Sequence, residues 1–270
     1  MREERGYTLV EIMLALVIML VVAGALHNLL LTTQRLSRKQ ASQADLQSNL
    51  RAGSIVVANE LRELSTAPSG TAAQNDILRI APAAVTYRAM RGVGFLCQTP
   101  TATGLRIGRQ GFTGHRDPQP GRDTAYVFVA GGWLPLAVTG VSTGSACPAS
   151  QGAGISLTIG NTPAVTELES GTPVRITELM ELRLYRSEGK SWLGARSVSA
   201  GEPIQPVVGP LSDGNGFALE YLNGAGVPTV DLTDIQSIRI TLRGRVEDSA
   251  MGSLDEQLTT AITLRNGLGP

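Results

Sequence analysis

Cysteine, histidine and lysine are scarce in this chain of 270 residues. With two cysteines and two histidines, a Cys/His zinc finger is excluded, and a catalytic zinc site would have almost no ligands. Lys39 and Lys190 are the two lysines among 23 Lys and Arg residues, which 23 Asp and Glu residues balance. A chain with zero net charge and no basic run is not expected to bind nucleic acid.

Proline is absent before Pro68, and the same segment holds three of the 31 glycines, Gly6, Gly24 and Gly53. All 14 prolines and the other glycines follow. Helix interiors disfavour both residues, whereas turns between strands use them. We therefore expect a helical first quarter and a remainder of strands and turns. The apolar fraction of 42% is enough to bury a core, so a disordered chain is excluded.

An apolar run without charge extends from Ile12 to Leu26, and the stretch from Tyr7 to Leu26 comprises 20 residues with Glu11 as its one charged side chain. About 20 residues are needed to span a bilayer. A carboxylate in hydrocarbon is costly unless it is paired, so Glu11 suggests a function. If the chain were cut after Gly6, the new amine of Tyr7 would lie one helical turn from Glu11 and could pair with it, or with Glu11 of a neighbouring subunit.

The stretch Arg5-Gly6-Tyr7-Thr8-Leu9-Val10-Glu11 before an apolar helix resembles the signature of type IV prepilins. This family includes pilins, minor pilins and the pseudopilins of type II secretion. The resemblance implies cleavage between Gly6 and Tyr7 by a prepilin peptidase, N-methylation of Tyr7, and charge pairing of Glu11 during assembly. The sequence departs from the family pattern at two places, since Tyr7 replaces the commoner Phe and Asn28 lies where many major pilins carry a proline.

Two other interpretations of the N-terminus remain open. Ala23-Gly24-Ala25 matches the small-residue cleavage site of a signal peptide, although Glu3, Glu4 and Glu11 are unusual there. A plain membrane anchor would explain the length of the span but not the sequence from Gly6 to Glu11. Cationic residues on both sides of the span do not fix its orientation. The resemblance places the C-terminal domain outside the cytoplasm, in the periplasm.

The helical pattern continues beyond the span. A continuous helix from Tyr7 to Leu64 would be about 87 Å long at about 1.5 Å per residue. Its second half carries one apolar stripe that needs a sheet to cover it, and the polar stretch 65–70 ends it. The stripe residues follow one another at whole numbers of helical turns: Leu36, Leu46, Leu50, Val57, Leu61 and Leu64.

The remainder shows the alternation of apolar and polar residues that is typical of antiparallel strands with one buried face. Asn223-Gly224 is a hairpin-turn signal. We expect long loops around two or three strands between Cys97 and Gly171. The predicted strands are 77–80, 85–88, 126–129, 155–159, 174–186, 238–243 and 258–264.

These observations predict an α+β, pilin-like fold, in which a long N-terminal transmembrane and amphipathic helix packs on a mainly antiparallel β-sheet with long loops. The expected segments are a leader peptide at 1–6, a membrane-spanning part of the helix at 7–31, its amphipathic continuation at 32–67 and a β-rich globular domain at 68–270. The order of strands over about residues 77–266 loosely resembles W-type minor pilins and J-type pseudopilins.

Cys97 and Cys147 stand 50 residues apart. Export, which the resemblance implies, would bring them into an oxidising compartment, so we expect a disulfide between them. Two buried thiols are the alternative. The bridge would stabilise a loop-rich segment by about 4 kcal/mol in the chain-entropy model.

Three short motifs match catalytic or metal-binding patterns but lack the required context. Gly140-Val-Ser142-Thr-Gly144 fits a nucleophile elbow, yet no histidine follows it. Ser187-Glu-Gly-Lys190 fits S-x-x-K but is expected to be a turn between strands, and Asp213-Gly-Asn215-Gly is expected to be a turn and not a calcium loop. We therefore expect neither an enzyme nor a cofactor nor a metal site.

The predicted function is that of a structural and assembly subunit, a minor pilin or pseudopilin of a type IV pilus or a type II secretion pseudopilus. The expected partners are other pilins or pseudopilins through the N-terminal helix, prepilin peptidase, the inner-membrane assembly platform and membrane lipid. The expected location is the inner membrane, in a single pass, and then the assembled filament. A surface-displayed adhesive or DNA-uptake minor pilin and a membrane-tethered periplasmic enzyme are the alternatives.

Overall fold

The computed structural model describes residues 8–66, 75–129, 132–148, 152–248 and 252–265. The chain divides into two compact units, each made of two segments of the sequence. The first unit comprises Met1–Ser48 and Val246–Leu254, and the second comprises Asn49–Arg245 and Asp255–Pro270.

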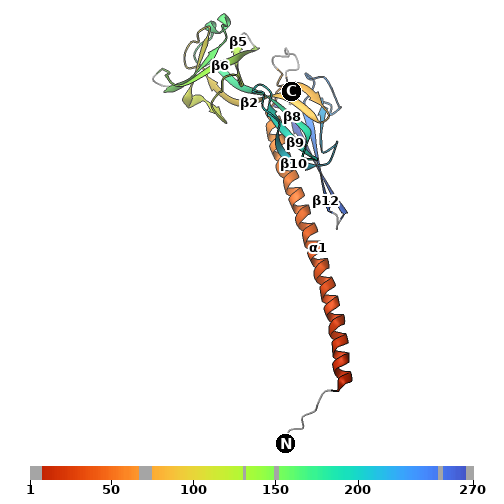
Figure 1. The fold of residues 1–270 in the computed structure, drawn as a ribbon. Helices are drawn as coiled ribbons and strands as arrows, with labels where there is room; N and C mark the ends of the chain where they lie inside the picture. Colours follow the sequence, from red (N-terminus) through yellow and green to blue (C-terminus); the bar gives the residue numbers. More distant parts are fainter. Residues whose placement is uncertain (1–7, 67–74, 130–131, 149–151, 249–251, 266–270) are drawn as a thin grey trace. The chain divides into compact units, whose positions relative to one another are not determined.

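The first element is a single long helix, α1, which runs from Leu9 to Arg62 over 54 residues (Figure 1). It begins two residues after Tyr7 and ends two residues before Leu64, and thus five residues before the expected end of the helical segment at 67. α1 is long and apolar enough to cross a membrane, by length and composition. The apolar stretch that meets this criterion is 0% buried. The predicted long N-terminal helix is confirmed.

The later part of α1 belongs to the second unit and packs within it. Gly53 lies so close to Val208 of strand β10 (Gln205–Leu211) that a Cβ at this position would overlap with the Val208 side chain. Leu36 is 55% exposed, so the buried stripe begins later than predicted. The members in the second unit are at most 3% exposed: Leu50, Val57, Leu61 and Leu64. Leu46, in the first unit, is also 3% exposed.

Ten antiparallel strands form the larger sheet. The order of its main path is β1-β2-β8-β5-β6-β7-β3, with β4 beside β2, β9 beside β8 and β10 beside β9. A smaller sheet has the order β11-β12-β13. The strands are β1 (Ile77–Ala81), β2 (Ala84–Phe95), β3 (Gly104–Gly108), β4 (Thr113–Gly114), β5 (Asp123–Val129), β6 (Gly132–Ala146), β7 (Ala153–Ile159), β8 (Pro173–Ser187), β9 (Lys190–Ser197), β10 (Gln205–Leu211), β11 (Phe217–Leu222), β12 (Ser237–Asp248) and β13 (Gly252–Thr263).

A helix packed on a mainly antiparallel sheet is the predicted α+β fold, and it is confirmed. Each of the seven predicted strands lies within or overlaps an observed strand. The segment between Cys97 and Gly171 was predicted to hold two or three strands among loops, and this was wrong, because it contains β3, β4, β5, β6 and β7 together with short 3₁₀ helices at Arg109–Gly111 and Pro163–Glu167. An apolar core lies here, which includes Leu105, Val127 and Leu157 and is completed by Val174 and Ile176 of β8.

Two predicted turns take different forms. Ser187 pairs with Lys190 across the end of β8 and β9, and the two residues between them, Glu188 and Gly189, have φ values of 52° and 75°. The S-x-x-K match is therefore a two-residue hairpin turn. After β11, Asn223 Oδ1 accepts the backbone N–H groups of Ala225 and Val227. This turn is wider than the two-residue hairpin that Asn223-Gly224 signals, and β12 begins only at Ser237.

Cys97 and Cys147 form a disulfide, with a Cα–Cα distance of 5.7 Å. This is the pairing that the sequence predicts. Cys97 N–H donates to the Arg106 carbonyl of β3, so the bridge ties the end of β6 to the β3 edge of the sheet. Gly154 lies against the bridge, and a Cβ there would be 2.8 Å from Cys147 Sγ.

Candidate functional site

The start of α1 is closed by reciprocal hydrogen bonds between Thr8 and Glu11. Glu11 Oε2 accepts the Thr8 backbone N–H at 3.0 Å and the Thr8 hydroxyl at 3.2 Å, and the hydroxyl oxygen lies 3.3 Å from Glu11 N, whose N–H it accepts. This is a capping box, which satisfies backbone donors that the first turn of a helix leaves without partners. Our reading of the sequence assigned Glu11 to charge pairing and missed the capping pattern, although Thr8-x-x-Glu11 carries its signal.

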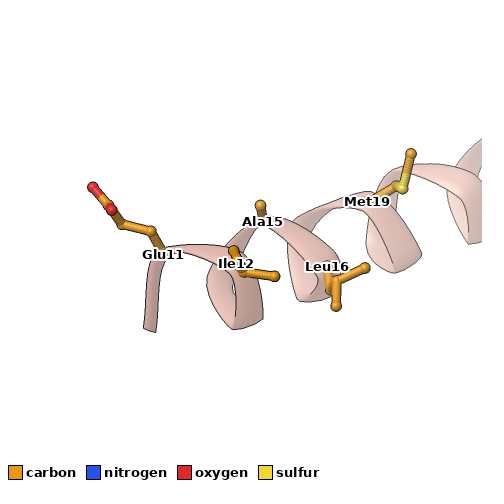
Figure 2. Close-up of a pocket in the computed structure, with 5 residues that line it drawn as sticks. All are labelled: Glu11, Ile12, Ala15, Leu16 and Met19. Carbon is orange, nitrogen blue, oxygen red and sulfur yellow. The ribbon is translucent and has the colours of Figure 1, made fainter. Parts of the chain in front are cut away.

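The apolar side chains that follow Glu11 are open on the helix surface. Ile12, Leu16 and Met19 are 53%, 55% and 69% exposed. Together with Ala15 they line a shallow groove beside Glu11, whose carboxylate extends away from them (Figure 2). An exposed apolar surface of this extent marks a membrane or protein interaction site. Lipid or another apolar helix could cover such a surface.

The structure describes some of the predicted site residues and not others. Glu11 lies in the first turn of α1, and Cys97 and Cys147 are joined. Gly6 and Tyr7, which the sequence analysis assigned to cleavage and methylation, lie outside the described residues.

A second group of charged residues converges on Glu178 of β8, whose side chain is 2% exposed. Its Oε2 lies 2.7 Å from Arg91 Nε and 3.3 Å from Arg116 Nη2, and its Oε1 accepts Arg122 Nε. Arg91 also reaches Glu60 of α1, at 3.2 Å. Within the second unit, this cluster therefore links the helix to strands β2 and β8.

The arginines of the cluster have further partners. Arg116 makes two bonds to Asp123, of 2.6 Å and 2.8 Å, and Arg122 bonds to Glu202 at 2.6 Å. The sequence analysis did not anticipate this ion-pair cluster. The signal was the gap in the apolar alternation of β8, because Glu178 occupies the position between Ile176 and Met180 on the buried face.

Burial by itself would raise the pKa of the Glu178 carboxyl. Hydrogen bonds from Ser197, Arg91 and Arg122, together with the Arg91 charge, outweigh burial and lower this pKa from 4.5 to about 2. The carboxylate is therefore ionised at neutral pH. With guanidinium partners on both of its oxygens it has a structural role and is not poised as a general acid or base.

We expect the free energy of unfolding to depend on pH through Glu178. Its pKa is 4.5 in the unfolded chain and about 2 in the folded one, so its contribution is fully present above pH 4.5 and is lost as the pH falls towards 2. Urea unfolding of the chain lacking residues 1–31, from neutral pH down to about pH 2.5, would measure this. The difference in stability between wild type and Glu178→Gln should shrink across that window. If the difference between wild type and Glu178→Gln stays constant with pH, the pH dependence of the free energy of unfolding does not come from Glu178.

The short motifs with catalytic or calcium patterns have ordinary structural roles. Ser142 is exposed on β6, where it pairs with Ser156 of β7. Asp213 accepts the Ser191 hydroxyl at 2.5 Å and lies 3.4 Å from Arg186. Within the part of the chain that the structure describes, no group of three or more His, Cys, Asp or Glu residues is arranged to hold a metal ion.

A family model described as the prokaryotic N-terminal methylation motif matches residues 1–26. No curated protein and no solved structure matches the chain. The matched segment contains Gly6, Tyr7, Thr8 and Glu11. The N-terminus therefore carries a match to a methylation motif, at the start of a helix that is apolar and long enough to cross a membrane.

Proposed function

We propose that this chain is a minor pilin or pseudopilin, a structural and assembly subunit of a type IV pilus or a type II secretion pseudopilus. The observation that carries this proposal is the methylation motif at residues 1–26, at the start of a 54-residue helix. The exposed apolar surface of that helix and the β-rich unit at its other end support it.

Processing is the first step of the proposed function. A prepilin peptidase removes the leader of residues 1–6 by cutting between Gly6 and Tyr7, and the new amine of Tyr7 is methylated. The segment 7–31 then spans the inner membrane, the segment 32–67 continues the helix, and the β-rich domain of residues 68–270 lies in the periplasm. The disulfide between Cys97 and Cys147 suits that oxidising compartment.

Assembly transfers the helix from lipid into a bundle of similar helices. Lipid tails are as apolar as the helix itself, so van der Waals packing and polar contacts between helices must supply the driving force. Glu11 supplies the polar contact by pairing with the amine of Tyr7 in its own or a neighbouring subunit. The partners are other pilins or pseudopilins and the assembly platform of the inner membrane, and the subunit itself performs no catalysis.

Co-purification tests this function. The full chain, cross-linked in cells and extracted with detergent, should bring down other proteins that carry the same methylation motif. The chain lacking residues 1–31 is the matched control and should lose these partners, because it lacks the exposed apolar surface. Recovery of soluble enzymes alone, or of the same partners with both forms, would contradict assembly through the helix.

A further inference from the structure

Six strands of the larger sheet close into a barrel. Strand pairing leads from β2 through β8, β5, β6 and β7 to β3. The ring then closes, because Leu96, directly after β2, forms a bridge pair with Ile107 of β3. The apolar core inside the ring receives side chains from its different strands, among them Val127, Leu136 and Val174. A closed barrel leaves no strand edge open, provided that every pair of neighbours stays joined.

The shortest joint of the ring is the seam between β2 and β3. Among the residues that the structure describes, Leu96 and Ile107 are the one bridge pair of this seam, and beside it the Cys97 N–H donates to the Arg106 carbonyl at 2.9 Å. By comparison, β3 and β7 pair in register over the whole segment from Gly104 to Gly108. A joint with so few backbone hydrogen bonds is expected to open before its neighbours do.

The disulfide lies across this seam. Cys97 is on the β2 side, where it bonds to β3, and Cys147 directly follows β6 on the other side. The bridge passes over β7 at Gly154, since a Cβ at Gly154 would lie 2.8 Å from Cys147 Sγ. It therefore joins covalently the two strands that flank β7 and β3, and β3 cannot leave β2 freely while the bridge is intact.

Arg106 of β3 makes a second, noncovalent connection over the same seam. Its guanidinium donates to Gln98 Oε1 on the β2 side at 2.9 Å and to the Ala146 carbonyl at the end of β6 at 2.8 Å. These bonds connect the same two parts of the barrel as the disulfide does. Hydrogen bonds of this kind contribute modestly and can be exchanged for water, so the covalent bridge is the stronger of the two connections.

The part of the second unit in which α1 packs has other core residues. Strands β2 and β8 continue into it from the barrel, and their register shifts between Met90 and Gly92. The core beyond this shift includes Leu61, Val85 and Leu193, which are at most 1% exposed and are not members of the barrel core. Two cores on either side of a register shift can open separately.

We infer that the disulfide is a redox-sensitive strap, which holds the barrel closed at the seam between β2 and β3 and whose reduction opens the barrel while the part around α1 stays folded. A dithiol supplies two electrons and two protons, so that the S–S bond breaks into the thiols of Cys97 and Cys147 and the dithiol becomes a cyclic disulfide. The barrel is then fully closed in an oxidising compartment and open in a reducing one. This inference does not depend on the proposed function.

Hydrogen exchange of the full chain in detergent, followed by mass spectrometry before and after reduction with dithiothreitol, tests the inference. Backbone amides of β3 and β7 should exchange about a thousandfold faster after reduction, the order that the chain-entropy model gives for two cysteines 50 residues apart. Amides of β9 and β11, which lie outside the ring, should change by less than about threefold. Removal of the dithiol and reoxidation should restore the slow exchange.

A chain with both Cys97→Ser and Cys147→Ser is the matched control. It should show the fast exchange of β3 and β7 from the start and should not respond to dithiothreitol, which excludes other effects of the reagent. Equal acceleration in β3, β7, β9 and β11 on reduction of the wild type would overturn the inference, because the bridge would then stabilise the whole unit and not the barrel. Unchanged exchange of β3 and β7 would also overturn it, because the barrel would then stay closed without the bridge. Neither result bears on the proposed function.

Discussion

The Glu11→Val variant should be inserted and cleaved normally but should fail to enter the filament. The substitution makes the span more apolar, so insertion should be as good or better. The pairing of a carboxylate with an amine inside a helix bundle is lost, and the unpaired partner costs roughly 3–5 kcal/mol when it is fully buried. Such a loss lowers incorporation by more than about a hundredfold. Shear fractionation with an antibody against the β-rich domain would measure it.

Two variants control for effects other than charge. Glu11→Gln keeps the size of the side chain and removes the charge, so it should also fail to assemble. Ala15→Val enlarges an apolar side chain in the same groove and should retain more incorporation than either. If Glu11→Val enters filaments as the wild type does, either the pairing account is wrong or the subunit sits at the tip, where no amine lies above it. Cross-linking of the first helical turn to neighbours separates these two cases.

The Glu178→Gln variant should lose roughly 3 kcal/mol of folding free energy, the lower end of the range for breaking a buried ion pair. Glu178 is 2% exposed and accepts from Arg91, Arg116 and Arg122. Removing its charge leaves three guanidinium groups without their shared partner. Each of them keeps one other carboxylate, of Glu60, Asp123 or Glu202, which limits the loss. Urea unfolding of the chain lacking residues 1–31 would measure it.

A surface ion pair provides the matched control for Glu178. Glu220 bonds to Arg239 with side chains 42% and 46% exposed, and exposed pairs contribute about 0–1 kcal/mol. Glu220→Gln should therefore change stability by less than about 1 kcal/mol. Equal losses in Glu178→Gln and Glu220→Gln would show that burial of the Glu178 cluster adds nothing to stability.

The sequence predicted the elements whose periodicity is strong. The long helix was predicted to within two residues at its start and five at its end, because a chain without proline before Pro68 and with spaced leucines has few alternatives. The strands β8 and β12 were predicted because apolar and polar residues alternate along them. Leu36 was assigned to the buried stripe by spacing alone, and its exposure of 55% shows that spacing does not say how far along the helix the sheet reaches.

The elements that were missed have weak local patterns. Strand β6 contains Pro135, Gly140 and Gly144 and exposes polar residues such as Ser142, so alternation indicates no strand there, and pairing with β5 and β7 defines it instead. The three ion pairs of Glu178 join residues that are 56 to 87 positions apart in the sequence. Local patterns carry no information about such contacts, and the one available sign was a carboxylate on the buried face of β8.

The mass of the intact chain from membranes tests the central claim most directly. If the N-terminus is a working prepilin signal, the chain should begin at Tyr7 and carry one added methyl group on its amine, and Gly6→Leu should abolish both changes because cleavage depends chiefly on Gly6. These results would show that residues 1–26, which match the methylation motif, direct cleavage and methylation of the chain. A chain that keeps Met1, or one cut near Ala25 as a signal peptide would be, would contradict the account.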